Sequence, residues 1–177
     1  MTRPTWGESA PWFTTSTSAH PELALDTMAG RFIALCFVPS SRSPEGRAVI
    51  AALAAHRALF QDVPCSFLGA TADALDRAEG RVVDDIPGIR WFHDDAAAVA
   101  RQYGAVDDEG RLVPCWFMLD PTLRVIATGP ADKLGALIEV ARRLPAPHLH
   151  AGCELTAPVL LLPRLFEPAL CQALIDY

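Results

Sequence analysis

The chain has 177 residues, of which 51% are hydrophobic and 20% are charged, and its formal net charge is −6. This composition excludes a disordered chain and supplies enough apolar residues for a core. The negative charge argues against binding of nucleic acid through the phosphate backbone. No apolar run reaches the roughly 20 residues of a membrane span, and residues 1–20 lack the apolar core of a signal peptide. We therefore expect a cytoplasmic protein with neither nucleic acid nor a membrane as partner.

The spacing of cysteine and histidine predicts neither a disulfide framework nor a metal site. The number of cysteines is odd, and no two of them form a C-x-x-C pair. His148 and His150 form a close pair, but they lie in a Pro-rich stretch typical of a solvated linker. We expect no cofactor in this chain. The five cysteines are Cys36, Cys65, Cys115, Cys153 and Cys171.

The first regular elements follow an irregular stretch over residues 1–29. Residues 31–38 form a continuous apolar run, which is typical of a strand buried on both faces of a parallel sheet. Ser43 and Pro44 then predict an N-cap and a first-turn proline. The following helix has one face of residues spaced by three or four positions: Val49, Leu53, His56 and Phe60.

The middle of the chain continues the alternation of strands and helices. Residues 63–71 predict a second buried strand, and residues 72–80 predict a short helix that ends at a glycine. Residues 89–95 predict a short strand. Residues 95–104 predict a helix with an acidic cap and a terminal glycine.

The last elements of the main unit predict a hairpin and a helix. Residues 113–121 and 124–128 are two strands whose connection is too short for a parallel crossover, so they should pair antiparallel. Residues 131–144 predict an amphipathic helix. The order β-α-β followed by β-β-α favours an α/β thioredoxin fold with a mixed central sheet flanked by helices. Other mixed α/β folds share this order.

The end of the chain predicts a short strand-helix extension. Residues 1–144 form the main domain, and residues 145–158 are a Pro-rich linker. In the remaining segment, 159–177, an apolar strand precedes an amphipathic helix that opens at Pro168. One strand and one helix bury too little surface to fold alone. The segment therefore either packs on the main domain or begins a second domain.

Three stretches together resemble the peroxiredoxins of the alkyl hydroperoxide reductase and thiol-specific antioxidant group. The stretches are GESAPWF at residues 7–13, MAGRFIALCFVPSSRSP at 28–44, and DDAAAVARQYGAVDDEGRLVPCWFMLDPTLRVI at 94–126. The resemblance covers about residues 7–144. It implies a thioredoxin fold and an antioxidant oxidoreductase that reduces peroxides with a cysteine thiolate.

The resemblance also shows where this chain departs from the family. In the family, a reactive cysteine follows a Pro-x-x-x-Thr-Pro-x pattern. Aligned from Pro39, the chain has Ser43 and Pro44 in place of Thr-Pro and Gly46 in place of that cysteine. The family's arginine on the late core strand corresponds to Pro114. The site loop is therefore degenerate, since neither the sulfur nor the cation is present at these positions.

Other residues offer alternative chemistry near this loop. Cys115 follows Pro114, near where a thioredoxin fold brings a loop close to the active site, and is the candidate for a displaced thiol. Arg42 and Arg47 flank the loop and are candidates for an anion site at the exposed N–H groups of the helix start, the alternative being two solvated arginines. Cys36 lies in a predicted buried strand, where free cysteine is usually inert.

The environments of the other three cysteines follow from their predicted elements. Cys65 lies in a predicted buried strand and should be inert, and Cys171 on the terminal helix should pack in a core. Cys153 lies in the linker and should be exposed.

Residues 157–177 resemble the entry strand and first helix of the iron and 2-oxoglutarate dependent dioxygenases of the prolyl hydroxylase type. That chemistry requires a His-x-Asp or His-x-Glu pair and a later His. His20 with Glu22 and His93 with Asp95 have the spacing of the pair, but both lie in the main domain, ahead of the segment that carries the resemblance. The resemblance therefore implies a truncated start of a dioxygenase domain, with Fe(II) and 2-oxoglutarate bound only further downstream.

Three functions remain open at this point. The first is a pseudoenzyme, a peroxiredoxin-like module that binds or regulates and is fused to an oxygenase in cis. The second is an active thiol-dependent peroxide reductase that uses Cys115. The third is a stabilising or homodimer-forming accessory to an enzyme carried downstream.

Overall fold

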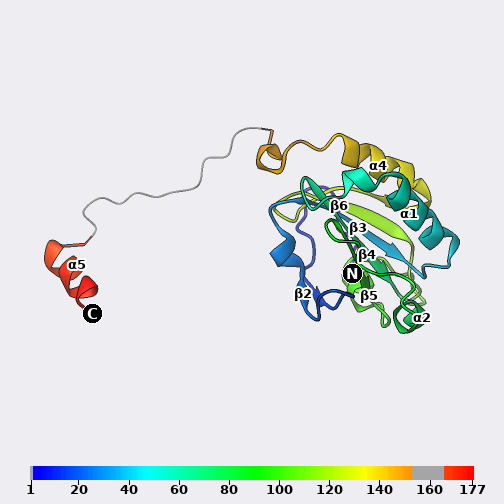
Figure 1. The fold of residues 1–177 in the computed structure, drawn as a ribbon, viewed down its shortest axis with the longest axis horizontal. Helices are drawn as coiled ribbons and strands as arrows, with labels where there is room; N and C mark the ends of the chain where they lie inside the picture. The colour runs from blue at the N-terminus through cyan, green and yellow to red at the C-terminus, as the bar shows by residue number, and fades with distance from the viewer. Residues whose placement is uncertain (1, 153–165) are drawn as a thin grey trace.

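The computed structural model describes residues 2–152 and 166–177 (Figure 1). Its main unit is a five-stranded mixed sheet in the order β5-β4-β3-β6-β7. β3 lies in the middle, pairing in parallel with β4 and antiparallel with β6. This order confirms the predicted α/β thioredoxin fold. The sheet strands are β3 (Phe32–Val38), β4 (Cys65–Thr71), β5 (Ile89–His93), β6 (Cys115–Leu119) and β7 (Val125–Pro130).

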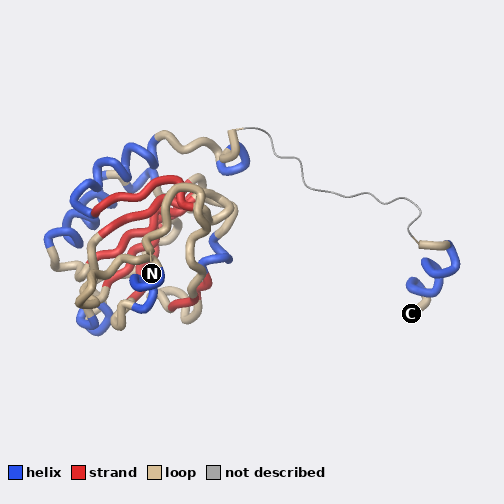
Figure 2. The backbone as a smooth tube through the Cα atoms, turned by 180° about the vertical axis from the view of Figure 1, so that it is seen from behind, coloured by secondary structure: helices blue, strands red, loops and turns tan. Residues whose placement is uncertain are grey.

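Helices and an N-terminal segment cover the two faces of the sheet (Figures 1 and 2). One face carries α1 and α4, and the other carries the N-terminal segment and α3. The α-helices are α1 (Pro44–Ala55), α2 (Ala74–Ala78), α3 (Ala98–Gln102), α4 (Leu134–Arg142) and α5 (Pro168–Ile175). The short strands and 3-10 turns are β1 (Thr14–Thr15), β2 (Leu23–Ala24), η1 (Leu25–Met28), η2 (Arg57–Leu59), η3 (Ala131–Lys133) and η4 (Pro147–Leu149).

The central strand supplies side chains to a separate core on each face. Cys36 and Val38 of β3 pack in the helical core, which includes Val49 of α1. Phe37 packs in the N-terminal core, which includes Tyr103. Because both faces are covered, every residue of β3 is buried, and this explains its continuous apolar sequence.

Two sequence predictions differ from the structure near the chain start and in α1. Residues 1–29 are not wholly irregular, because β1 pairs antiparallel with β2 and η1 follows. α1 ends at Ala55, and His56 caps it with a φ of −124° and a ψ of 28°. Phe60 reaches the helical core through η2 instead of continuing the helix face. Tertiary packing of the aromatic ring therefore replaces helical periodicity after the cap.

α3 begins at Ala98 with Ala97 as its N-cap, three residues later than predicted, and the carboxylate that caps its first amides belongs to Asp94. Its Oδ1 accepts from the Val99 amide at 3.1 Å, and its Oδ2 accepts from the Ala100 amide at 2.7 Å. The Asp94 amide donates to the Thr71 carbonyl at 2.7 Å, which ties the cap to β4. Asp95, where the predicted helix begins, is exposed. The cap therefore also anchors the chain as it leaves β5.

The C-terminal helix forms as predicted, beginning at Pro168, and its side chains are exposed. Cys171 on this helix is exposed, so its predicted core packing is wrong. The predicted strand after residue 158 and the linker cysteine, Cys153, lie outside the described residues. The division into a main domain over 1–144, a linker over 145–158 and a second segment therefore stays a prediction. Within the described ranges, none of the helices has the length and apolar character to cross a membrane.

We predict that Asp94→Ala lowers the free energy of unfolding by about 1–2 kcal/mol, because two buried amide donors lose their acceptor. Asp95→Ala is the matched control, since it removes the neighbouring carboxylate from an exposed position, and it should change that energy by less than about 0.5 kcal/mol. Urea unfolding followed by circular dichroism measures both. Equal effects of the two substitutions would contradict the assignment of the cap.

Candidate functional site

Three parallel strands end at the same edge of the sheet. In the register, Val38 of β3 lies opposite Thr71 of β4, and Thr71 lies opposite His93 of β5. The loops that follow these three strands therefore meet at one edge. In α/β sheets, ligands bind outside the carboxyl ends of the parallel strands. This edge is the candidate functional site.

The loop after β3 leads directly into α1, as predicted. Ser43 is the N-cap, and its Oγ accepts from the Gly46 amide at 3.0 Å. Pro44 occupies the first turn, where a missing N–H costs nothing. Pro39 directly follows β3, so the degenerate motif spans this strand end and the helix start. The predicted cap residues are confirmed.

Gly46 is packed so closely that a side chain has no space. A Cβ built on this residue would lie 2.0 Å from the carbonyl oxygen of Ser40 and 2.9 Å from its carbonyl carbon. That carbonyl also accepts from the Ser43 amide at 3.1 Å, which holds it in a turn. The backbone of the loop therefore occupies the position where the family resemblance implies a cysteine side chain.

The same loop is tied to α2 through buried polar groups. Ser41 donates its amide to Oδ2 of Asp76 at 2.7 Å and its hydroxyl to Oδ1 at 2.6 Å. Ser40 Oγ donates to Asp73 Oδ2 at 2.7 Å, and this hydrogen bond is the main cause that lowers the pKa of Asp73. Arg81 forms ion pairs with both carboxylates, at 3.1 Å and 3.4 Å. Asp76 is 0% exposed, so its two oxygens depend on these partners.

The two arginines of the predicted anion site have partners within the protein. Arg42 lies 3.6 Å from Glu79 in an ion pair. Arg47 donates from Nη1 to the Arg42 carbonyl at 2.6 Å. The Gly46 amide, at the helix start between them, is occupied by the Ser43 hydroxyl. An anion at this helix start stays a prediction, and it would compete with these contacts.

The three strand cysteines are buried thiols. Burial raises the pKa of Cys36 well above its ordinary value and raises that of Cys65 to about 12. Burial also raises the pKa of Cys115 to about 11, although the Arg3 charge opposes the shift. Because the thiolate is the reactive form, these environments suppress thiol chemistry at neutral pH.

The sheet separates Cys115 from the helix start. Cys115 lies opposite Phe37 in the register and packs with it in the N-terminal core. Val49 of α1 packs in the helical core on the other face. Cys115 therefore lies near the end of the sheet that carries the candidate site, but on the face away from α1. Among the described residues, cis peptide bonds precede Pro64 and Pro87, so the bond before Pro114 is trans.

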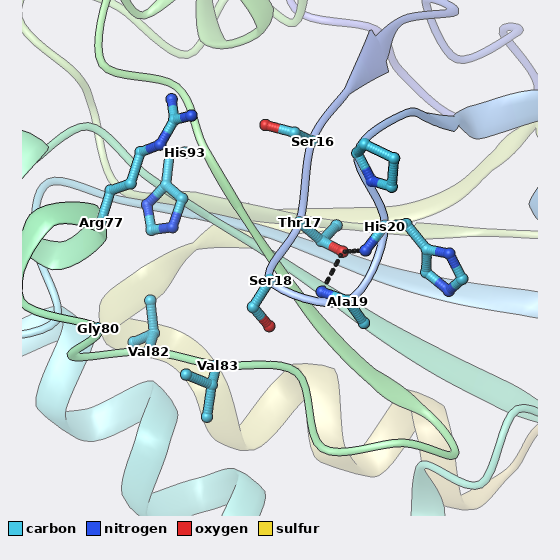
Figure 3. A pocket seen from close by; sticks show the side chains of 11 residues that line it. Ser16, Thr17, Ser18, Ala19, His20, Arg77, Gly80, Val82, Val83 and His93 are labelled. Carbon is cyan, nitrogen blue, oxygen red and sulfur yellow. Dashed lines mark hydrogen bonds between the residues drawn. The ribbon is translucent and has the colours of Figure 1, made fainter.

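A pocket of about 590 Å³ lies beside the end of β5, where no sequence pattern predicted one. Figure 3 shows the side chains of Arg77 and His93 on one side of the Ser18 loop. The pKa of His93 is lowered, mainly by burial. A polar residue directly after an apolar strand was the available signal, but the loop that closes the pocket comes from the distant residues 16–21. Among the described residues, no group of three or more His, Cys, Asp or Glu could hold a metal ion.

Solved structures with this fold come from several peroxiredoxins. A thioredoxin peroxidase I of Plasmodium yoelii is 17% identical, with a TM-score of 0.64 over 87% of this chain and 97% of that one. The AhpC of Mycobacterium tuberculosis is 14% identical, with a TM-score of 0.63 over 80% and 95%. A reduced 2-Cys peroxiredoxin of Plasmodium vivax is 18% identical, with a TM-score of 0.61 over 77% and 96%. At these identities the likeness shows the fold.

The family is shown by a separate comparison. The model of the AhpC/TSA family matches residues 6–128, which is more than half of the chain. Comparison with curated proteins gives no match. The matched range includes the degenerate loop, the strand cysteines and the pocket beside β5. The chain is therefore a member of the AhpC/TSA family.

Proposed function

We propose that this AhpC/TSA domain is a binding or regulatory module that does not reduce peroxides. The observation that carries the proposal is the closure of the site loop on Gly46, where the Ser40 carbonyl occupies the space of a side chain. The buried pair between Ser41 and Asp76 supports it, because it holds the loop in this closed form. The fold is thus retained while the position of the nucleophile is filled by backbone.

The chemistry of peroxide reduction sets the requirement that this loop does not meet. A thiolate sulfur attacks one peroxide oxygen, the O–O bond breaks, and the sulfur becomes a sulfenic acid while the leaving oxygen takes a proton. The sulfur must be ionised, accessible and close to groups that stabilise the departing charge. Gly46 has no sulfur, and Pro114 has no cation.

The second candidate function is peroxide reduction by Cys115. Its position level with Phe37 at the site end of the sheet favours it, as does the opposing charge of Arg3 on its pKa. Against it stand its complete burial and its pKa of about 11. Burial has the larger effect on the pKa of Cys115 than the charge of Arg3, so we favour the binding role.

The partners and location remain proposals. We propose that residues 159–177 begin an oxygenase domain in cis, and the exposed apolar side chains of Leu170, Leu174 and Ile175 on α5 support a further packing partner. Fe(II) and 2-oxoglutarate would belong to that domain. We also propose self-association as a homodimer, supported by the exposed Trp6 and Trp12. A cytoplasmic location is proposed from composition alone.

We predict that Gly46→Ala lowers the free energy of unfolding by about 1–3 kcal/mol, because the new methyl group meets a backbone oxygen that must move. Gly135→Ala is the matched control, since nothing lies within 4 Å of a Cβ on this glycine of α4. The control should raise the same energy by about 0.5–1 kcal/mol. Urea unfolding measures both variants. If Gly46→Ala were as stable as the control, the loop would not be closed.

We predict that native alkylation with iodoacetamide at pH 8 modifies Cys171 at least about 100-fold faster than Cys115. Cys171 is exposed, whereas Cys115 is buried with a pKa of about 11. That pKa leaves about one thiol in a thousand ionised at pH 8. Peptide mass spectrometry measures each site, and the unfolded chain in guanidinium should show similar rates. Equal rates in the folded chain would refute the burial argument.

We predict that the reduced chain consumes hydrogen peroxide with dithiothreitol no faster than its Cys115→Ser variant. Both should show only slow oxidation of exposed thiols, because the closed loop offers no nucleophile. The assay follows peroxide loss and then maps all five cysteines by mass spectrometry. Rapid turnover that is lost in Cys115→Ser would establish peroxide reduction by Cys115 and would refute the proposed binding role without peroxidase activity.

A further inference from the structure

The pocket beside β5 has walls from three separate parts of the chain. The loop over 16–21 forms one wall, α2 and the following turn form another, and the end of β5 forms the third (Figure 3). Arg77 is the only arginine, lysine, aspartate or glutamate among the described residues that line it. Val82 and Val83 supply an apolar surface. The lining thus combines one cation with apolar groups, hydroxyls and imidazoles.

The 16–21 wall is held in place by hydrogen bonds to Asp84. The hydroxyl of Thr17 donates to Asp84 Oδ2 at 2.6 Å, and the Asp84 amide donates to Ser18 Oγ at 2.8 Å. The Trp91 amide donates to Oδ1 of the same carboxylate at 2.8 Å. Thr17 also forms a β-bridge with Phe92 of the edge strand. The pocket is therefore preformed, and both oxygens of Asp84 are already used.

Two neighbouring polar side chains at the base of this region lack partners. Thr71 is 0% exposed, and its Oγ1 has no hydrogen-bond partner among the described residues. The same holds for Nδ1 of His93. The two residues are register partners on adjacent strands, so their side chains leave the same face about 5 Å apart. The pairing that would satisfy both groups is donation from the Thr71 hydroxyl to Nδ1, and it requires the Thr71 side chain to turn toward the imidazole.

That hydrogen bond would fix the tautomer of His93 and therefore which ring nitrogen can donate to a ligand in the pocket. Burial lowers the pKa of His93, so its ring is neutral at neutral pH and carries one N–H. With Nδ1 accepting from Thr71, the proton is on Nε2. The ring then offers a hydrogen-bond donor beside the Arg77 guanidinium.

Arg77 is available for an external partner. It is exposed, and among the described residues it forms no ion pair with a carboxylate. The acidic groups whose charges act on the adjacent His93 are Asp76, Asp84 and Asp95. The first is bound by Ser41 and the second by the 16–21 loop, and none of the three lines the pocket.

We propose that this pocket binds a small organic anion, whose carboxylate or phosphate pairs with Arg77 and accepts from His93 Nε2 while its apolar part lies on Val82 and Val83. Thr71 is a positioning residue that holds the His93 tautomer. The proposal rests on the binding role proposed above and names its ligand class. It does not involve the cysteines, so the peroxide assay and the binding test can fail independently.

The test is an NMR titration of the full chain with three probes at constant ionic strength: butyrate, methyl phosphate and inorganic phosphate. We expect saturable shifts of the 16–21 and 80–83 amides with a Kd of about 1 mM or tighter. Butyrate or methyl phosphate binding more tightly than inorganic phosphate identifies an organic anion and its head group. Equal or stronger binding of inorganic phosphate, or no saturable shift with any probe, would overturn the proposal.

Variants separate the specific site from general charge attraction. Arg77→Gln should weaken binding by at least about tenfold. Arg143→Gln is the matched control, since it removes an exposed arginine from the end of α4 and should leave binding unchanged. Thr71→Val should shift the His93 ring ¹⁵N resonances toward a mixture of tautomers, which a packing role alone would not do. Equal affinities of Arg77→Gln and the wild-type chain would refute the site.

Discussion

The parallel pairing of β4 with both of its neighbours is the constraint on which the candidate sites depend. It sets Val38, Thr71 and His93 level at one edge, so the loop into α1 and the pocket beside β5 share one end of the sheet. Because β3 is buried on both faces, a slip by one residue would exchange its two sets of side chains between the cores. Packing therefore holds the register that positions the edge.

At this edge, backbone and buried polar groups fill the loop between β3 and α1. The turn at Ser40 lies over Gly46, and the fully buried Asp76 holds Ser41 from the other side. A buried carboxylate without its donors would cost several kcal/mol. The loop and α2 therefore stabilise each other, and opening the loop would break the donors of Asp76 as well.

The pocket beside β5 is separate from the degenerate loop although both lie at the same edge. Its cation, Arg77, is on α2, the same helix that carries Asp76 into the loop network. One short helix therefore supplies a residue to each of the two regions. Cys115 takes no part in either arrangement, because its side chain faces the N-terminal core.

The sequence by itself determined the order of the sheet strands and of the helices, and the Ser43 cap, since these are local patterns of hydrophobicity, capping and spacing. It placed the acidic cap of α3 at Asp95 instead of Asp94. The sequence cannot distinguish two adjacent aspartates, and only the contact of Asp94 with β4 does so. Tertiary structure alone decided the closure over Gly46, the sheet face of Cys115 and the pocket. Each depends on groups distant along the chain, whose approach is set by packing and strand register.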